Sequence, residues 1–243
     1  MDNFIYGIRP VIEAVESGKE IEKLLIQKGL RSELHHELMK LVSERSIPYQ
    51  FVPIQKLNRV TRKNHQGVLA FVSLIAYQKI ENVLPMVFED GRVPFILLLD
   101  GITDVRNLGA IARTAECAGV DALVIPEKGS AQVNPDAMKT SAGALNKIPV
   151  CREKSLKQAC LFLKNSGVRL IAASEKSEQP YYRSNMLDPV AIIMGSEEKG
   201  VGSNLQLICD EVVSIPMKGE IQSLNVSVAA GILIFEGAKQ RSS

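Results

Sequence analysis

From residue 94 onward, short and almost wholly apolar runs alternate with helix-like stretches. The runs are FILLLD, ALVIP, VRLIAAS, VAIIMG and VVSIP. A strand that is apolar on both faces is typical of a parallel sheet covered by a helical layer on each side. This pattern constrains the fold more than any other feature, and it predicts an α/β domain with a parallel sheet over residues 94–243.

Residues 1–75 predict a second, smaller α/β domain. The stretches RPVIEAVESG and SELHHELMKLVSER are expected to form helices, the second with Ser32 as its N-cap. The runs EKLLIQ, YQFV and GVLAFVSL are typical of strands. Residues 76–93 show no strong periodicity and contain Pro85 and an Asp-Gly pair, so we expect a linker there.

The composition narrows the class of protein. Apolar residues make up 46% of the chain and charged residues 23%, as in an average globular protein. No run of about 18 apolar residues is present and the N-terminus lacks a signal pattern, so we expect no membrane span and a cytoplasmic location. The four cysteines form no C-x-x-C pair, so neither a metal site nor a disulfide framework is expected.

The charge of the chain is nearly balanced, with a formal net value of +2. Residues 1–75 hold 11 Lys and Arg against 8 Asp and Glu, whereas the other 168 residues hold 18 against 19. The small basic excess is compatible with nucleic-acid binding by the N-terminal domain, and equally with an ordinary solvated surface.

Three polar, glycine-containing segments follow predicted strands in the C-terminal half. They are GITDVRNLGAIART, GSEEKGV and MKGEIQSLNVSVAAG. Because parallel strands place their carboxyl ends at one edge of the sheet, where ligands bind, we expect these segments to meet there. None of them is a G-x-G-x-x-G or Walker A loop, which disfavours dinucleotide and P-loop chemistry. All three histidines precede residue 66, so a Ser-His-Asp or Cys-His centre within this half is also disfavoured.

Three segments resemble, in order and spacing, the three motifs of the SpoU (TrmH) family of the SPOUT superfamily. They are DGITDVRNLGAIARTAECAGV, IIMGSEEKGV and IPMKGEIQSLNVSVAAGILIFE. The segments YGIRPVIEAV and NHQGVLAFV resemble the small L30e-like RNA-binding domain that many members carry. The match covers most of the chain, and its closest branch is that of the bacterial large-subunit rRNA guanosine enzymes.

The resemblance implies a function, a cofactor and partners. The expected activity is S-adenosylmethionine-dependent 2′-O-methylation of a guanosine ribose in large-subunit ribosomal RNA, as naked RNA or in a pre-ribosomal particle. The C-terminal domain is expected to contain a deep trefoil knot and to form a homodimer through its last helix. Two alternatives stay open: the same chemistry on tRNA or another rRNA site, and a non-catalytic RNA-binding protein of ribosome assembly.

By the same resemblance, five residues form the catalytic group: Arg113, Asn107, Glu197, Ser223 and Asn225. A guanidinium keeps its proton under nearly all conditions, so our hypothesis is that Arg113 grips the target phosphate and electrostatically lowers the pKa of the 2′-hydroxyl.

Three of these residues also have a structural alternative. For Arg113 the alternative is a surface ion pair with Glu116, three residues further along a helix. Asn107 and Asn225 both stand at expected helix starts, where each is a candidate N-cap. For Glu197 we expect contact with Arg113 or with the positive charge of the cofactor.

The resemblance assigns cofactor binding to Gly195, Ile215, Met217 and Leu224. The glycine would let the backbone approach the cofactor, and the three apolar residues would enclose its adenosine.

In the N-terminal domain, the turn TRKNHQG brings together Arg62, Lys63 and His65. We interpret it as a candidate phosphate contact, with an ordinary exposed turn as the alternative.

Overall fold

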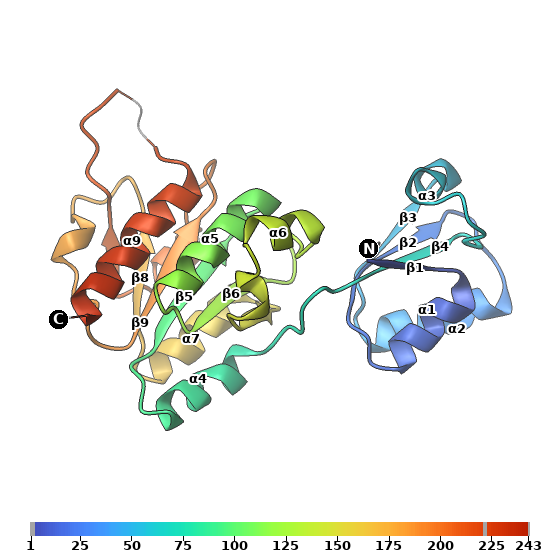
Figure 1. Ribbon diagram of the computed structural model, residues 1–243, viewed down its shortest axis with the longest axis horizontal. Coiled ribbons are helices and arrows are strands. Elements are labelled where there is room, and N and C mark those ends of the chain that lie inside the picture. The colour runs from blue at the N-terminus through green and yellow to red at the C-terminus, as the bar shows by residue number, and fades with distance from the viewer. Residues whose placement is uncertain (1–2, 221–222, 243) are drawn as a thin grey trace. The chain divides into compact units, whose positions relative to one another are not determined.

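The computed structural model describes residues 3–220 and 223–242. The chain divides into two compact units, Met1–Ala76 and Tyr77–Ser243. Both are α/β units, as the sequence predicted, and each has its own sheet and core (Figure 1).

The N-terminal unit is a four-stranded sheet in the order β1-β4-β2-β3. Its strands are β1 (Phe4–Tyr6), β2 (Ile21–Gln27), β3 (Tyr49–Val52) and β4 (Val68–Val72), and its helices are α1 (Ile8–Glu16), α2 (Glu33–Glu44) and α3 (Ile54–Val60). Strand β4 runs antiparallel to β1 and β2, while β3 is parallel to β2. Figure 1 shows α1 and α2 on one side of this sheet and α3 on the other.

The C-terminal unit is a six-stranded sheet in the order β10-β8-β9-β5-β6-β7. Every strand pair in it is parallel, which confirms the predicted sheet. The strands are β5 (Phe95–Asp100), β6 (Ala122–Pro126), β7 (Val150–Glu153), β8 (Arg169–Ala173), β9 (Val190–Gly195) and β10 (Glu211–Val213). The helices are α4 (Ile80–Glu89), α5 (Val105–Cys117), α6 (Pro135–Thr140), α7 (Leu156–Asn165), α8 (Ser203–Gln206) and α9 (Val226–Arg241).

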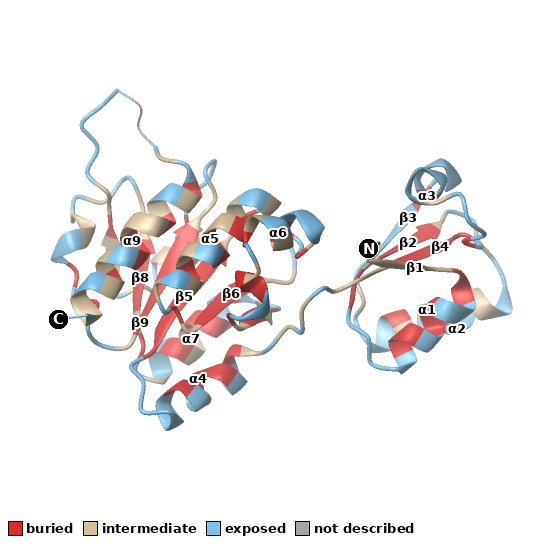
Figure 2. Ribbon diagram, in the orientation of Figure 1, coloured by how far each residue is buried: buried red, intermediate tan, exposed pale blue. Residues whose placement is uncertain are grey.

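Helices cover both faces of the six-stranded sheet. Helices α4 and α7 share a core with alternate strand residues such as Ile96 and Leu98. On the other face, α6 and α9 each pack against α5 (Figure 1). The strands are therefore buried along most of their length, as Figure 2 shows, and this explains why they are apolar at successive positions.

The residues expected to form a linker belong largely to the C-terminal unit. Helix α4 occupies most of the range 76–93, and its Ile80, Val83 and Leu84 are buried in the core. The linker prediction is therefore wrong for these residues. The apolar residues do recur with a helical spacing, but Pro85 lies inside the helix and obscured the pattern.

The C-terminal end of α9 is bonded to the loops that precede β5 and β9. At its last turn, Arg241 donates hydrogen bonds to the backbone oxygens of Val93, Pro94, Met186 and Asp188. Its first turn lies beside the motif residues described below. None of the helices in the described residues combines the length and apolarity that crossing a membrane requires. The trefoil knot implied by the resemblance stays a prediction.

Candidate active site

The three motif segments meet at one edge of the C-terminal sheet. Strands β5 and β9 are parallel neighbours, paired from Phe95 and Val190 to Asp100 and Gly195. The segments that follow them therefore start side by side. Helix α9 begins within the third segment and packs along α5, which begins within the first. The predicted meeting of the motifs is thus a consequence of strand order and of this helix pair.

The start of α5 is capped by Asp104 rather than by Asn107. The Asp104 Oδ1 atom accepts hydrogen bonds from the backbone N–H groups of Arg106 at 2.7 Å and Asn107 at 3.1 Å. Asn107 lies in the first turn, so its side chain is free for other contacts. The sequence signal for this cap is an Asp immediately before the helix, which our motif-based prediction did not use.

Glu197 is the centre of a hydrogen-bonded group that contains one residue from each motif. Its Oε1 atom accepts from Asn225 Nδ2 at 2.7 Å, from the backbone N–H of Val226 at 3.1 Å and from Asn107 Nδ2 at 3.4 Å. Asn225 Nδ2 also donates to Asn107 Oδ1 at 3.0 Å. We call Asn107, Glu197 and Asn225 the motif cluster.

Asn225 has both of the roles considered from the sequence. Its Oδ1 atom caps α9 by accepting from the backbone N–H of Ser227 at 3.0 Å, while its Nδ2 atom points into the motif cluster. One side chain thereby fixes the start of α9 and the position of the Glu197 carboxylate.

Arg113 is exposed, and the ion pair with Glu116 is not formed. Glu116 instead accepts from Lys147, with 3.1 Å between Oε1 and Nζ. Within the described residues the Arg113 guanidinium makes no hydrogen bond or ion pair, and it does not contact Glu197. Ser223 is likewise exposed and makes no hydrogen bond to a described residue. The catalytic roles of both residues stay predictions.

The packing of the loop after β9 requires a glycine at position 195. A Cβ atom at this position would lie 1.9 Å from the carbonyl carbon of Gly200 and 2.0 Å from the nitrogen of Val201. The loop between them closes with a hydrogen bond from Gly200 N to Ser196 O at 2.8 Å. The close approach predicted for Gly195 is therefore present between two parts of one loop, and its contact with a cofactor stays a prediction.

The three apolar residues predicted to enclose the adenosine lie between β10 and α9. Met217 is exposed, and Ile215 and Leu224 are half-buried, although all three are apolar. Their backbone N–H and C=O groups make no hydrogen bond to the backbone of the described residues. Apolar walls with free backbone donors and acceptors are what a purine ring needs, so these residues fit the predicted cofactor.

Three of the four cysteines have raised pKa values. Burial raises the pKa of Cys151 and of Cys160 to about 12, and that of Cys209 to about 11. These thiols are protonated at neutral pH and are poor nucleophiles.

Asp100 is a residue that our sequence interpretation missed. Its Oδ2 atom accepts a hydrogen bond from the backbone N–H of Gly202 at 2.8 Å, which connects the first motif to the loop after the second.

In the N-terminal unit, only part of the predicted phosphate contact lies at the surface. Arg62 and Lys63 are exposed, but His65 is buried. The backbone N–H of Gly67 donates to His65 Nδ1 at 3.0 Å, and Nε2 lies 2.9 Å from Asn58 Oδ1. Since both ring nitrogens are used within the turn, His65 stabilises the turn, and our prediction that it contacts phosphate is corrected.

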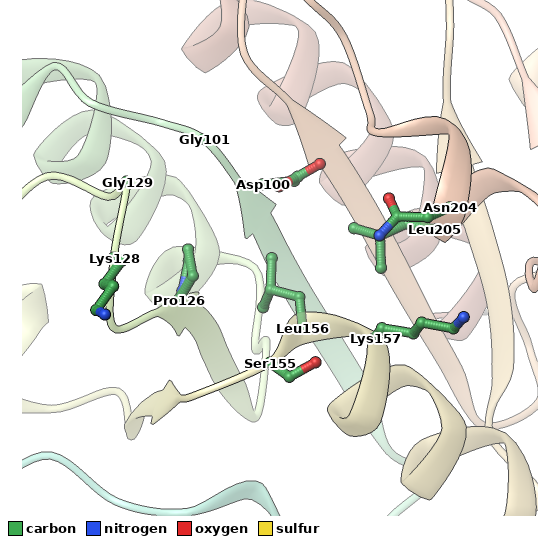
Figure 3. A pocket seen from close by; sticks show the side chains of 10 residues that line it. All are labelled: Asp100, Gly101, Pro126, Lys128, Gly129, Ser155, Leu156, Lys157, Asn204 and Leu205. Atoms are coloured by element: carbon green, nitrogen blue, oxygen red, sulfur yellow. The ribbon is translucent and has the colours of Figure 1, made fainter.

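A hollow of about 320 Å³ opens at the same edge of the C-terminal sheet, beside the ends of β5 and β6 and the starts of α7 and α8. Asp100 and Gly101 line it, and the side chains of Lys128 and Lys157 lie on opposite sides of it (Figure 3). None of the predicted catalytic or cofactor residues lines this hollow. It adjoins the first motif but does not contain the motif cluster.

Comparison with known sequences decides the family. The sequence model of the SpoU rRNA Methylase family matches residues 94–235. The chain belongs to this family. A second family model, described as RNA 2′-O ribose methyltransferase substrate binding, matches residues 4–78. The resemblance predicted from the three motifs, and the enzyme class that it implied, are confirmed.

Relatives and solved structures agree with this assignment. The chain is 35% identical to the 23S rRNA (guanosine-2′-O-)-methyltransferase RlmB of Escherichia coli, with all of both chains covered. It is similar to the SpoU methyltransferase AviRb from Streptomyces viridochromogenes in complex with AdoMet, with 25% identity, a TM-score of 0.62, and coverage of 98% of this chain and 90% of that one. The TrmH/SpoU tRNA modifying enzyme of A. aeolicus is 29% identical with a TM-score of 0.58, but covers 62% of this chain and 77% of its own.

Proposed function

We propose that the chain transfers the methyl group of S-adenosylmethionine to the 2′-hydroxyl of a guanosine ribose in large-subunit ribosomal RNA. The observation that carries the proposal is the motif cluster, in which one residue from each family motif is hydrogen-bonded to the others. The full-length similarity to a 23S rRNA guanosine methyltransferase supports the substrate, and the AdoMet complex of AviRb supports the cofactor.

The reaction needs a positioned hydroxyl, an acceptor for its proton and compensation for developing charge. When bound, S-adenosylmethionine supplies an electrophilic methyl group on a positively charged sulfur. Ile215, Met217 and Leu224 would hold its adenosine. Glu197 Oε2 accepts no hydrogen bond from the described residues, while Oε1 accepts three, so Oε2 is the oxygen that could balance positive charge or hold a proton.

Arg113 would supply positive charge to the RNA. It is exposed on α5, and six residues, or about 9 Å of helix, separate it from Asn107. In our hypothesis its guanidinium grips the phosphate next to the target nucleotide and stabilises the alkoxide that forms as the hydroxyl loses its proton. Ser223 and the motif cluster would orient the ribose.

Two further assignments concern the cellular location and the oligomeric state of the protein. We assign the chain to the cytoplasm, because its four cysteines are free thiols and its substrate would be ribosomal RNA. We also assign it to a homodimer through α9. Val228 and Phe235, seven residues apart on that helix, are each more than half exposed, and such an apolar face is typical of a subunit contact.

A transfer assay tests the proposal and separates the alternatives. Labelled methyl groups are followed from S-adenosylmethionine into unmodified large-subunit rRNA and, in parallel, into bulk tRNA, and the label is mapped to a nucleotide and an atom. The proposal predicts a single 2′-O-methylguanosine in the rRNA. Label in tRNA alone would keep the chemistry and reject the substrate. Absence of transfer to rRNA, tRNA and precursor particles, with cofactor binding intact, would favour the non-catalytic assembly protein.

A further inference from the structure

The N-terminal unit leaves all of its aromatic side chains at or near the surface. Residues 1–76 contain five aromatic residues, and none of them is buried: Phe4, Tyr6, Tyr49, Phe51 and Phe71. The core beneath α1 and α2 is aliphatic, with Val11, Leu24, Leu38 and Val68 among its members. Because aromatic rings gain most from burial, rings that stay accessible on a small unit are candidates for ligand contact, and their placement on the sheet decides between them.

Three of these rings share the sheet face that α3 only partly covers. Phe4, Tyr6 and Phe71 pack beside the small cluster that contains Leu57 of α3. The centroids of Phe4 and Phe71 are 6.2 Å apart, and those of Phe4 and Tyr6 are 6.4 Å apart. All three rings are half-buried, so each is held in place while part of it stays accessible.

Two lysines stand at the ends of this aromatic row. In the strand register, Phe71 lies opposite Phe4 on one side and Lys23 on the other, so the three side chains share a face. Lys63 reaches the other end, with its Nζ atom 5.6 Å from the centre of the Tyr6 ring. We call Phe4, Tyr6, Phe71, Lys23 and Lys63 the aromatic face.

The sequence of this unit contains no acidic residue after α2. No Asp or Glu occurs between Glu44 and Glu81, a range that includes β3, α3, the turn at residues 61–67 and β4. That range carries Lys56 and Arg59 on α3, together with Arg62 and Lys63. The acidic residues of α1 and α2 lie on the other side of the sheet, and they are Glu13, Glu16, Glu33, Glu37 and Glu44.

We propose that the aromatic face binds single-stranded RNA of the substrate by base stacking, with Lys23 and Lys63 contacting phosphates. A sheet face with two or three aromatic rings and flanking cations can bind unpaired bases of any sequence, because every base has a flat π-surface that stacks on a ring. The basic charge on this side complements a phosphate backbone. The proposal rests on the proposed function for the identity of the RNA, but stacking can be measured without methyl transfer.

The full chain with Tyr6→Leu and Phe71→Leu tests the stacking. Binding is followed by the fluorescence anisotropy of a short, fluorescein-labelled oligoadenylate. Loss of two stacking rings should raise the Kd about tenfold or more. The matched control is Tyr49→Leu with Phe51→Leu, since these two rings lie on the edge strand β3 and share the face of Leu24 and Ile26, toward α1 and α2. The control should bind as the wild type does.

A second pair of variants tests RNA binding without changing residues of the core, so that unfolding does not obscure the result. Lys23→Ala with Lys63→Ala removes charge without removing core residues, and should reduce the slope of log Kd against log salt by about 0.7 for each phosphate that is no longer neutralised. Lys40→Ala, on the exposed face of α2, should leave that slope unchanged.

The two proposals fail in different ways. If the wild type binds the oligoadenylate and the aromatic variants weaken it, stacking holds even when no methyl transfer is found. An unchanged Kd in a folded aromatic variant would overturn the proposal, as would an equal loss in the β3 control. If the aromatic variant is a monomer where the wild type is a dimer, and its RNA affinity is unchanged, the proposal is also overturned. That result would show that a second copy of the chain covers this face.

Discussion

On α5, Arg113 lies among small side chains in the middle of the helix. Arg113 is exposed, while Gly109, Ala112 and Ala115 on the same helix are buried. A Cβ atom on Gly109 would lie 2.7 Å from Thr140 Cβ, so the small residues are explained by the close approach of α6. Nothing in that packing needs an arginine, so the role of Arg113 at the RNA stays a prediction that its exposure allows.

Replacing Arg113 with lysine tests that role. Lysine keeps the charge but cannot present two parallel N–H donors, so we expect kcat to fall by about a hundredfold while S-adenosylmethionine binding is unchanged. The control is Arg106→Lys, an exposed arginine in the first turn of the same helix, which should keep the wild-type rate. A wild-type rate and an unchanged pH profile in Arg113→Lys would show that the guanidinium fork is not needed.

The roles of single residues could be predicted from the sequence only in part. The motifs identified Asn107, Glu197 and Asn225, because their identity and spacing are specific. The Asp104 cap of α5 has a sequence signal that the motif-based prediction did not use, whereas the sequence does not reveal that Glu197 bonds two asparagines rather than Arg113. His65 was misassigned because a histidine between basic residues is typical of a phosphate contact, whereas its burial depends on Asn58 and Gly67 in the fold.

At the scale of the element, α2 contains a buried histidine nitrogen that has consequences for stability. His35 Nε2 is buried and has no hydrogen-bond partner among the described residues. Burial, and then the neighbouring His36, lower the pKa of His35 below its ordinary value. Protonation in the folded state would place an uncompensated charge in this position.

The pH dependence of α2 follows from that shift. Unfolded His35 binds a proton below about pH 6.5, whereas folded His35 does so only at lower pH. The unfolded state is therefore favoured as the pH falls through this window, and the free energy of unfolding should decrease. Hydrogen exchange of α2 amides, corrected for intrinsic rates, measures the effect.

Two histidine variants provide the control for this prediction. His35→Leu should remove most of the pH dependence, whereas His36→Gln should keep most of it, because burial is the larger cause of the shift. The opposite result for the two variants would contradict the assignment.

Among the elements, apolar strands were predicted best. All five apolar runs of the C-terminal half are strands, because burial on both faces leaves a continuous pattern. The short strands β1 and β7 were missed, although β3 and β10, which are as short, were predicted. Helix α4 was missed because Pro85 and the Asp90–Gly91 pair resemble the composition of a linker.

For the whole molecule, the exposed face of α9 predicts assembly. Replacing Val228 and Phe235 with Asp should convert a homodimer into a monomer, because charge on an apolar contact opposes its desolvation. Sedimentation at micromolar concentration checks the mass. Met86→Asp, an equally exposed apolar position on α4, should leave the dimer intact. A dimer that survives the α9 change, or a monomeric wild type, would reject this interface.

The central claim is that the motif cluster acts as one catalytic unit. The direct measurement is a double-mutant cycle with Asn107→Ala and Glu197→Gln, read as the single-turnover rate of labelled methyl transfer to large-subunit rRNA. Each change alone should slow transfer by about tenfold or more. The double variant should be about as slow as the slower single variant, because residues that act together lose their effect together. Two fully additive effects, or wild-type rates in either single variant, would contradict the claim.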